Sequence, residues 1–283
     1  MEKRKWKNIF PRRKTDRLAV LFVMTELFVE VYFELFIILP QVYPTPSLAM
    51  YLHVCFGFYL LFNTLGNMIL AIIVDSSTGA EILPAVLQPE WRYCPTCMQN
   101  SPPRAVHCFM CEKCVLKREH HCIFIGKCVG IRNHRYYMMT VFYLAVGSLY
   151  ANFMNIDYAL NLLGGFSLKT GLAMIAPILG WIFGVTESMS FFISFQCGTC
   201  ILSCLMFFTL LVFHTWLIYR GQVTYEWRHG IKDYDVGWKQ NFIQVFGKRW
   251  YLVWLFPTIS SPLPCNGIKY MKKNDKIENV KDM

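Results

Sequence analysis

Residues 94–128 read CPTCMQNSPPRAVHCFMCEKCVLKREHHCIFIGKC, and the rest of the chain is interpreted outward from this stretch. It holds seven of the 12 cysteines and three of the seven histidines of the 283-residue chain. Three CxxC-type steps so close together indicate zinc, which proteins bind through four Cys or His ligands in tetrahedral sites. The segment is also too short for a hydrophobic core of its own, so we expect bound metal to supply its folding energy.

The number of possible ligands exceeds what zinc needs. Seven cysteines and three histidines give ten candidates, whereas two tetrahedral zinc sites use eight. Two residues are left over, and a cysteine beside a histidine is the chemically interesting pair to leave. Because a thiolate next to an imidazole is an activated nucleophile, the count suggests a catalytic cysteine inside a zinc domain.

Long apolar runs flank this segment on both sides. Residues 18–39 and 48–74 precede it, and apolar sequence returns over 136–219 with an interruption at 164–171. Each of the first two runs is long enough for a membrane-spanning helix, which needs about 20 residues. Hydrophobic residues make up 55% of the chain and charged residues 16%, which excludes disorder and disfavours a purely soluble globule. The apolar residues do not alternate, which argues against a transmembrane β-barrel.

The basic residues predict the topology. Residues 1–17 contain eight Lys or Arg, residues 75–137 contain eight and residues 220–283 contain 11, which leaves only Lys169 elsewhere. Basic segments stay in the cytoplasm, so all three polar segments belong on that side. An even number of spans must then lie within 136–219, and about 84 residues hold two spans and a loop.

Four spans are therefore expected, at 18–39, 48–74, 137–163 and 192–219. The apolar run 172–187 is an alternative fifth span by hydropathy alone. A fifth span would move the basic tail out of the cytoplasm, so we expect a lumenal or re-entrant segment there instead.

A cytoplasmic location removes two other interpretations of the cysteines. Disulfides do not persist in the reducing cytosol. A DNA-binding finger needs a spacer of about 12 residues followed by a His-x3-5-His helix, and this segment lacks that pattern and is tethered between spans. We therefore expect no nucleic acid among the partners.

The spacing C-x2-C-x9-HC-x2-C-x2-C-x4-EHHC-x5-C-x4-N resembles the cysteine-rich domain of DHHC-type protein S-acyltransferases, the palmitoyltransferases. Asn133 and Tyr137 continue the ending of that motif. The sequence VTYE, with Thr224 and Glu226, resembles the family's TTxE motif with its first Thr lost. Asn241 begins NFIQVFG, which resembles the C-terminal motif whose Asn contacts the ends of the spans. The resemblance extends over nearly the whole chain.

The resemblance implies two interleaved structural zinc sites. One would consist of Cys94, Cys97, His107 and Cys114, and the other of Cys108, Cys111, His121 and Cys128. These eight ligands leave Cys122 and His120, in agreement with the ligand count.

The resemblance also implies a catalytic set and a reaction. Cys122 would be the nucleophile, His120 its base and Glu119 the carboxylate that orients His120, in the manner of a Ser–His–Asp triad with a thiol. Cys122 would take the acyl group of a long-chain acyl-CoA such as palmitoyl-CoA. A cysteine of a membrane-apposed protein would then receive it, while an apolar tunnel among the four spans holds the acyl chain.

Basic residues near Cys122 are candidates to bind the CoA phosphates. They are Lys117, Arg118, Lys127, Arg132 and Arg135. The alternative is that these cations pair with lipid headgroups, and the sequence does not decide between the two.

Three departures from the family pattern matter. Glu119 replaces the usual Asp, and Ile123-Phe124 replaces the usual Pro-Trp after the nucleophile. Asp75-Ser76-Ser77 only partly matches the Asp-Pro-Gly that often follows span two. The first two motivate a rival hypothesis: a catalytically weak zinc-containing membrane adaptor that binds acyl-CoA or client proteins without turnover.

Several polar residues lie inside the predicted spans. One helical stripe of span one carries Glu26, Glu30 and Glu34. Intramembrane carboxylates are functional candidates by default, but we interpret these as a packing seam that could face Asn63 and Asn67 of span two. Span four carries Cys197, Cys200 and Cys204, which we interpret as small packing residues. His214 could line the acyl cavity, although a structural role is preferred.

The predicted fold class is an all-α membrane protein with four transmembrane helices and a cytoplasmic two-zinc cysteine-rich domain between helices two and three. The expected parts are a cytoplasmic N-terminus 1–17, a transmembrane hairpin 18–74, a zinc and catalytic domain 75–136, spans three and four at 137–219 with the lumenal or re-entrant segment 164–190, and a cytoplasmic tail 220–283. The resemblance implies a location in endoplasmic reticulum or Golgi membranes.

Overall fold

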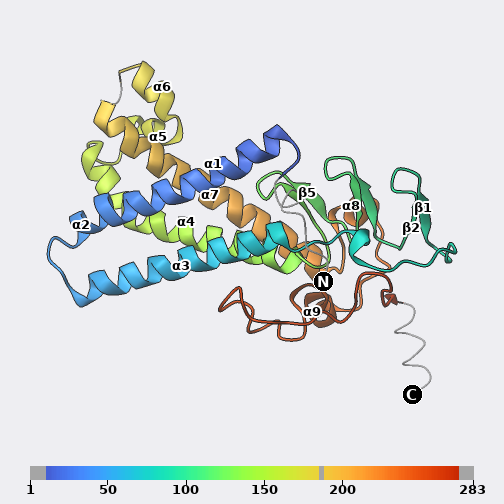
Figure 1. Cartoon of the computed structure of the whole chain (residues 1–283). Helices are drawn as coiled ribbons and strands as arrows, with labels where there is room; N and C mark the ends of the chain where they lie inside the picture. The colour runs from blue at the N-terminus through green and yellow to red at the C-terminus, as the bar shows by residue number, and fades with distance from the viewer. Residues whose placement is uncertain (1–10, 185–187, 274–283) are drawn as a thin grey trace. The chain divides into compact units, whose positions relative to one another are not determined.

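A computed structural model of the chain describes residues 11–184 and 188–273, and Figure 1 shows its backbone. These residues fall into two compact units. The described parts of the first unit are residues 11–23, 65–140 and 212–273, and those of the second are 24–64, 141–184 and 188–211. The boundaries between the units fall inside long helices.

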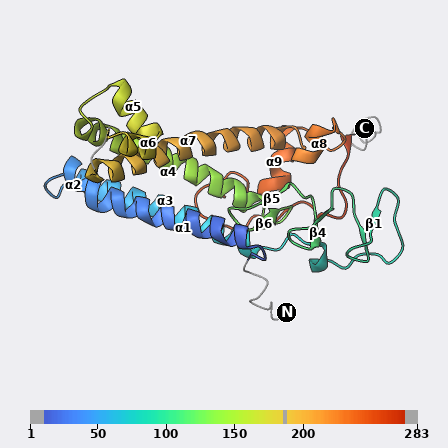
Figure 2. The ribbon, with the colours of Figure 1, turned by 90° about the horizontal axis from the view of Figure 1, so that it is seen from above.

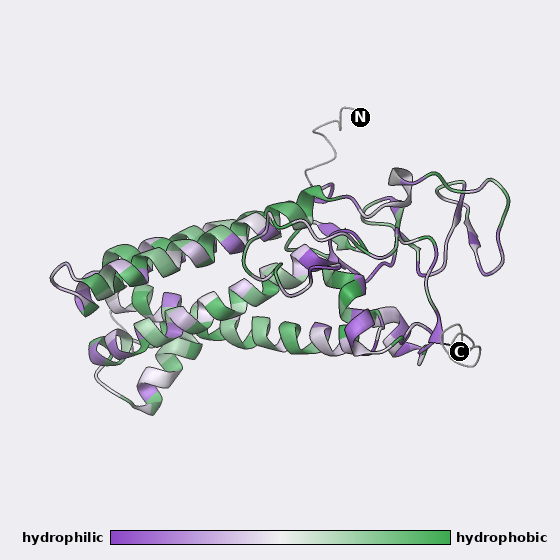
Figure 3. Cartoon of the chain, turned by 90° about the horizontal axis from the view of Figure 1, so that it is seen from below, coloured by the Kyte–Doolittle hydropathy of each residue, from purple (hydrophilic) through white to green (hydrophobic). Residues whose placement is uncertain are grey.

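Helices make up most of the described chain. The long ones are α1 (Lys14–Phe33), α3 (Leu48–Ile73), α4 (His134–Leu162) and α7 (Ser188–Tyr219). The shorter ones are the π-helical turn η2 (Glu34–Ile38), α2 (Leu39–Val42), the 3-10 turn η3 (Thr78–Ala80), α5 (Leu168–Ile175), α6 (Pro177–Ile182), α8 (Thr224–Arg228) and α9 (Trp238–Phe246). Figure 3 shows that apolar residues, in green, are frequent along the long helices.

Three of the described helices are long and apolar enough to cross a membrane. They are Leu48–Ile73, His134–Leu162 and Ser190–Tyr219, at the positions of predicted spans two, three and four. The predicted first span, 18–39, is divided among α1, η2 and α2, and it carries three glutamates, whereas each of the other three predicted spans contains at most one acidic residue. Three apolar helices fit a membrane protein, and the fourth span remains a prediction.

The second unit has a core of side chains contributed by distant parts of the chain. Its buried members are Phe33, Ile38, Leu39, Met154, Ala159, Met174 and Cys197. Met174 lies on α5 and Cys197 on α7, so the short helix α5 takes part in the same core as the long helices. Figure 2 shows α5 and α6 beside the first part of α7.

The described part of the apolar run 172–187, residues 172–184, does not form one helix. α5 ends at Ile175, and Pro177 begins α6, which ends at Ile182. Proline cannot donate the hydrogen bond that a continuous helix needs at that position. Helices of eight and six residues are too short to cross a bilayer, which favours a segment that does not span. Residues 185–187 lie outside the described residues.

Gly198 allows α5 to approach α7 closely. A Cβ atom on Gly198 would lie 2.0 Å from the carbonyl oxygen of Met174. Only a residue without a side chain permits so close an approach of two backbones. The packing of α5 within the second unit therefore depends on this glycine.

The cysteine-rich insert of the first unit is built from β-hairpins. The pairs are β1 (Arg92–Cys94) with β2 (Gln99–Ser101), β3 (Val106–Cys108) with β4 (Lys113–Val115), and β5 (His120–Cys122) with β6 (Lys127–Val129). This corrects the all-α expectation: the described fold is mostly helical, but the insert consists of strands and turns. Strands of three residues are too short to show a periodic apolar pattern, so they leave no signal in the sequence.

A buried ion pair fixes the tail to the insert within the first unit. The guanidinium of Arg104 donates to both carboxylate oxygens of Glu226 at 2.8 Å, and the two side chains are 1% and 6% exposed. Asn241 of α9 donates to the carbonyl oxygen of Tyr219, the last residue of α7, at 2.9 Å. Two residues of the tail motifs therefore anchor the tail, one to the insert and one to the end of α7.

We expect Gly198→Ala to lower the thermal stability of the detergent-solubilised protein. The added methyl group collides with the α5 backbone, and overpacking of this kind typically costs about 1–3 kcal/mol. Gly147→Ala is the matched control, because no atom lies within 4 Å of a Cβ at that helical glycine. Equal melting temperatures for Gly198→Ala and Gly147→Ala would contradict the close contact between α5 and α7.

Candidate functional site

The hairpin registers bring potential metal ligands together in pairs. In β3–β4, His107 lies opposite Cys114, and in β5–β6, His121 lies opposite Cys128. Directly opposite residues of antiparallel strands have Cβ atoms about 4.5–5.5 Å apart and face the same side. Each of these hairpins therefore presents one imidazole and one thiol that can hold the same metal ion.

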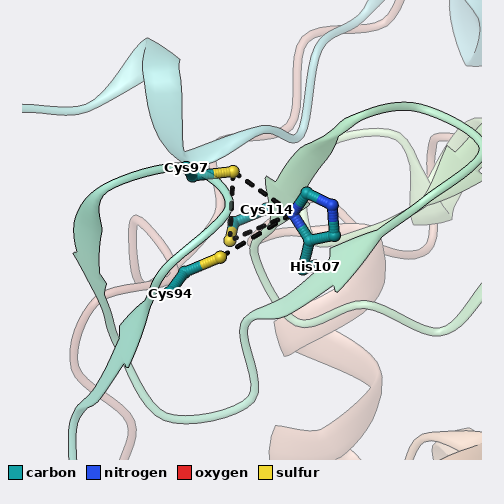
Figure 4. Close-up of side chains that lie close together, drawn as sticks. All are labelled: Cys94, Cys97, His107 and Cys114. Carbon is teal, nitrogen blue, oxygen red and sulfur yellow. Dashed lines mark hydrogen bonds between the residues drawn. The ribbon is translucent and has the colours of Figure 1, made fainter.

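A CxxC turn from the preceding hairpin completes each pair. The resulting sets are Cys94, Cys97, His107 and Cys114, and Cys108, Cys111, His121 and Cys128. Figure 4 shows the four side chains of the first set pointing toward one another. Both sets contain the residues that the sequence resemblance implied. They interleave because the adjacent strand residues His107 and Cys108 point to opposite faces.

The distances within the first set fit a tetrahedral zinc ion. Bonds of about 2.3 Å to sulfur and 2.0–2.1 Å to nitrogen imply edges of about 3.8 Å between sulfurs and about 3.5 Å from sulfur to nitrogen. Nδ1 of His107 lies 3.7 Å from Sγ of Cys94 and 3.2 Å from Sγ of Cys97. Sγ of Cys97 lies 3.7 Å from Sγ of Cys114. Three thiols and one imidazole at these distances suit a structural zinc site.

The second set has the same geometry. Nδ1 of His121 lies 3.3 Å from Sγ of Cys111 and 3.7 Å from Sγ of Cys128, and these two sulfurs are 3.7 Å apart. In both sets Nδ1 is the histidine atom that faces the sulfurs. The two clusters can therefore bind two zinc ions per chain.

Asp16 of α1 holds the outer nitrogen of His121. Nε2 of His121 lies 3.1 Å from Oδ2 of Asp16, and both side chains are 2% exposed. Because Nδ1 faces the sulfurs, Nε2 carries the proton and donates a hydrogen bond to the carboxylate of Asp16. Such a carboxylate fixes the orientation of a zinc-ligating histidine. Sequence reasoning missed Asp16, although it is the only acidic residue among residues 3–25.

Arg118 lies against the sulfurs of the second set. Its Nε donates to Sγ of Cys128 at 3.4 Å, and its Nη2 is 4.0 Å from Sγ of Cys108. Three thiolates around one divalent ion leave an excess negative charge. The positive charge of the Arg118 guanidinium can offset this negative charge. A hydrogen bond between oppositely charged groups is also stronger than one between neutral groups.

The pleat of β5 separates the ligand from the catalytic candidates. His120, His121 and Cys122 occupy consecutive positions of this strand. Successive side chains of a strand alternate between faces, so His121 points to the second cysteine set while His120 and Cys122 share the opposite face. The predicted base and nucleophile are thus presented together, on the face away from the metal cluster.

Glu119 is buried and surrounded by donors from the tail and from α7. Its Oε2 accepts the backbone N–H of Thr224 at 2.9 Å, and its Oε1 accepts the Thr224 hydroxyl. The same Oε1 lies 3.1 Å from Nδ1 of His214 and 3.7 Å from Nδ1 of His120.

The charge of Glu119 is stabilised despite its burial. Burial alone raises the pKa of a carboxyl group, but the contacts with His120 and His214 outweigh it and hold the pKa of Glu119 well below its ordinary value. The carboxylate is therefore ionised at neutral pH and able to orient an imidazole.

His214 lies at this site, although from the sequence a purely structural role is preferred for it. The rings of His120 and His214 stack with centroids 5.3 Å apart, and Tyr137 meets both rings edge-on at 5.1 and 5.2 Å. From sequence alone, His214 is one histidine near the end of an apolar run, 95 residues from Glu119. The fold is needed to bring the two together.

Cys122 is half-buried, and burial raises the pKa of its thiol. Among the residues that the structure describes, no hydrogen bond joins its sulfur to His120. Catalytic hydrogen bonds are often long in a free enzyme and shorten when substrate binds. The structure thus places both groups on one face without closing the contact between them.

The five predicted CoA-binding cations are in different environments. Lys117 and Arg135 are buried, and Arg135 lies over the ring of Tyr136 with its Cζ 4.3 Å from the ring centroid. Arg132 forms an ion pair with Glu81, while Lys127 is half-buried. The partners that the structure shows for Arg118, Arg132 and Arg135 differ from one another.

One of the predicted intramembrane carboxylates, Glu30, contacts α7. Glu30 accepts hydrogen bonds from Nε2 of Gln196 and, at 2.7 Å, from Sγ of Cys200. These contacts lie within the second unit and join α1 to α7. They agree with a packing seam and give Cys200 a defined partner, but the partner helix that they show is α7, whereas the expected partners Asn63 and Asn67 lie on α3.

Comparison with known proteins finds sequences similar to most of this chain. A family model described as DHHC palmitoyltransferase matches residues 87–231. A Rattus norvegicus protein named probable palmitoyltransferase ZDHHC24 is 33% identical over 234 residues, which cover 82% of each chain. Its Homo sapiens counterpart is 35% identical over 237 residues, again covering 82% of each chain. Palmitoyltransferase ZDHHC15A of Danio rerio is 27% identical over 192 residues, covering 62% of this chain and 52% of the relative.

We expect the purified protein to contain two zinc ions per chain by elemental analysis. Cys94→Ser and Cys108→Ser each remove one ligand from a different set, and each should lower the zinc content by at least one ion. Cys55→Ser is the matched control, because Cys55 is exposed and lies outside both sets. One zinc ion or none in the unaltered protein would contradict this assignment.

We expect Asp16→Leu to weaken zinc retention at the second site about 10- to 100-fold, the usual effect of losing the carboxylate behind a ligating histidine. Asp16→Asn should retain the metal, because its amide oxygen can still accept from Nε2 of His121. Zinc release to a competing chelator measures both. Glu112→Gln, at an exposed acid of the insert, controls for loss of charge. Release from Asp16→Leu at the rate of the unaltered protein would exclude this role.

Proposed function

The chain belongs to the DHHC palmitoyltransferase family, and we propose that it moves a long-chain acyl group from acyl-CoA, through a thioester on Cys122, to cysteine thiols of membrane-apposed proteins. The family assigns palmitoyltransferase activity to the chain. The donor, the covalent intermediate and the class of acceptor are the proposed parts. The observation that carries them is the position of Cys122 and His120 on one face of β5, with the carboxylate of Glu119 buried beside His120.

The first step acylates the enzyme. His120 takes the proton of the Cys122 thiol, and the thiolate attacks the thioester carbonyl carbon of acyl-CoA. The bond between that carbon and the CoA sulfur breaks, and His120 returns the proton to the departing CoA thiolate. Ionised Glu119 stabilises the imidazolium that forms between these two proton transfers.

The second step repeats the chemistry with a protein thiol. His120 takes the proton of a client cysteine, whose sulfur attacks the acyl carbon held on Cys122. The bond to Cys122 breaks, and its thiolate recovers the proton from His120. The enzyme returns to its starting state, and each exchange replaces one thioester by another.

Zinc supports this reaction through structure. When bound, the two ions supply the cross-links that hold the hairpins in register, and the eight residues of the two cysteine–histidine sets do not include Glu119, His120 or Cys122. Metal at the second site would keep His121 in place and thereby fix the orientation of β5.

We further propose four membrane spans, with α1 and its continuation through η2 and α2 as the first, and both termini in the cytoplasm. The distribution of Lys and Arg supports this orientation, because only Lys169 lies outside the three basic segments. The active site would then face cytoplasmic acyl-CoA and the cysteines of proteins at the membrane surface. Among the CoA-binding candidates, half-buried Arg118, Lys127 and Arg132 retain more exposure than Lys117 and Arg135.

We expect the purified protein to gain a hydroxylamine-sensitive acyl group from palmitoyl-CoA, as measured by intact mass. Cys122→Ser should gain none. Glu119→Gln should slow acyl-enzyme formation by at least about 100-fold, because a misoriented catalytic imidazole is costly, while the zinc content stays unchanged.

Cys55→Ser provides the matched cysteine control and should be acylated like the unaltered protein. If the unaltered protein with both zinc ions bound gains no acyl group, the chain is a membrane adaptor and the proposed reaction fails. Acylation that survives Cys122→Ser would place the intermediate on another residue.

A further inference from the structure

We propose that His214 is a positioning residue that holds the carboxylate of Glu119 from α7, so that Glu119 and His214 act as one unit on His120. The inference rests on the proposed acyl transfer, for which it names an additional residue. It connects the catalytic face of β5 to the end of the last long helix, within the first unit.

The distances give His214 the nearer position. Its Nδ1 lies 3.1 Å from Oε1 of Glu119, whereas Nδ1 of His120 lies 3.7 Å from the same oxygen. The side chain of His214 is 6% exposed and that of Glu119 is 1% exposed. A contact between two buried groups of opposite polarity is little screened by water, so this geometry is expected to restrain the carboxylate strongly.

The polar neighbour that the structure shows for Nδ1 of His214 is the Glu119 carboxylate. Within the described ranges this nitrogen is buried and makes no standard hydrogen bond, and Oε1 of Glu119 lies 3.1 Å from it. A histidine that merely filled space would leave this buried nitrogen without any polar neighbour, which destabilises a folded protein. The contact with the Glu119 carboxylate accounts for a buried imidazole at this position.

Two residues from different elements, Thr224 and His214, contact the carboxylate of Glu119. Thr224 holds the carboxylate through its backbone N–H and its hydroxyl, and His214 holds Oε1 from the side of α7. Stacking of the His214 and His120 rings, with an interplanar angle of 25°, keeps the two imidazoles side by side. His214 therefore fixes both the acceptor of the catalytic base and one face of its ring.

The test uses two substitutions at position 214 with opposite expected outcomes. His214→Leu keeps a side chain of similar size but replaces the imidazole by an apolar group. It should slow acylation of Cys122 about 10- to 100-fold. His214→Asn places an amide nitrogen near the former Nδ1 position and should restore most of the rate. Zinc content and melting temperature, measured in parallel, identify any variant that fails to fold.

A double-mutant cycle separates a positioning role from a purely structural one. If His214 acts through Glu119, adding His214→Leu to Glu119→Gln should slow acylation by less than twofold beyond Glu119→Gln alone. The same four proteins are compared in the rate of iodoacetamide alkylation of Cys122, read by peptide mass mapping. Alkylation needs no acyl-CoA, so it tests the His214 contact even if acyl transfer itself fails.

The outcomes are distinct. Slower acylation or alkylation with His214→Leu, recovery with His214→Asn and a non-additive cycle support the positioning role. Rates equal to those of the unaltered protein, or full additivity with Glu119→Gln, overturn it. If the unaltered protein is not acylated, the proposed function is overturned instead. The alkylation rates then still decide the role of His214.

Discussion

Neighbouring side chains of a β-strand must point to opposite faces, and the whole site depends on this constraint. In β5, the residue committed to the second cysteine set is His121, so His120 and Cys122 must share the other face. In β3, the same rule sends His107 and Cys108 to different sets. Metal bound by one residue of a strand thus also orients its neighbours, and a segment whose small core cluster consists largely of its own cysteines acquires a rigid frame.

The buried carboxylate of Glu119 draws distant parts of the first unit into one site. A buried charge is tolerated only where hydrogen bonds and opposite charges compensate it. Thr224 supplies two of those bonds from the tail, and two imidazoles lie close to Oε1, His120 of β5 at 3.7 Å and His214 of α7 at 3.1 Å. The tail itself is fixed two residues later, where Glu226 pairs with buried Arg104. The tail is therefore part of the proposed catalytic centre as well as of the fold.

The parts of the fold that sequence predicted are those with a local pattern. Cysteine spacing and family resemblance predicted both ligand sets, and apolar run length predicted the three helices that can span a membrane. The three-residue strands had no period to detect, although the ligand pairs His107–Cys114 and His121–Cys128 turn out to be cross-strand neighbours. Asp16 and His214 are single residues far along the chain from their partners. Their roles come from tertiary contacts, which spacing does not encode.

The glutamate at position 119 agrees with its surroundings better than the family's shorter aspartate would. The backbone N–H of Glu119 donates to the carbonyl of Val129 at 2.9 Å, which extends the β5–β6 pairing and fixes where the side chain begins. With that origin fixed, the stem length decides how far the carboxylate reaches toward Thr224 and His214. Removing one methylene would withdraw it by roughly one bond length, on the order of 1 Å, and a 2.9 Å hydrogen bond does not survive that change. The longer acid and its partners on α7 and α8 are therefore matched to one another.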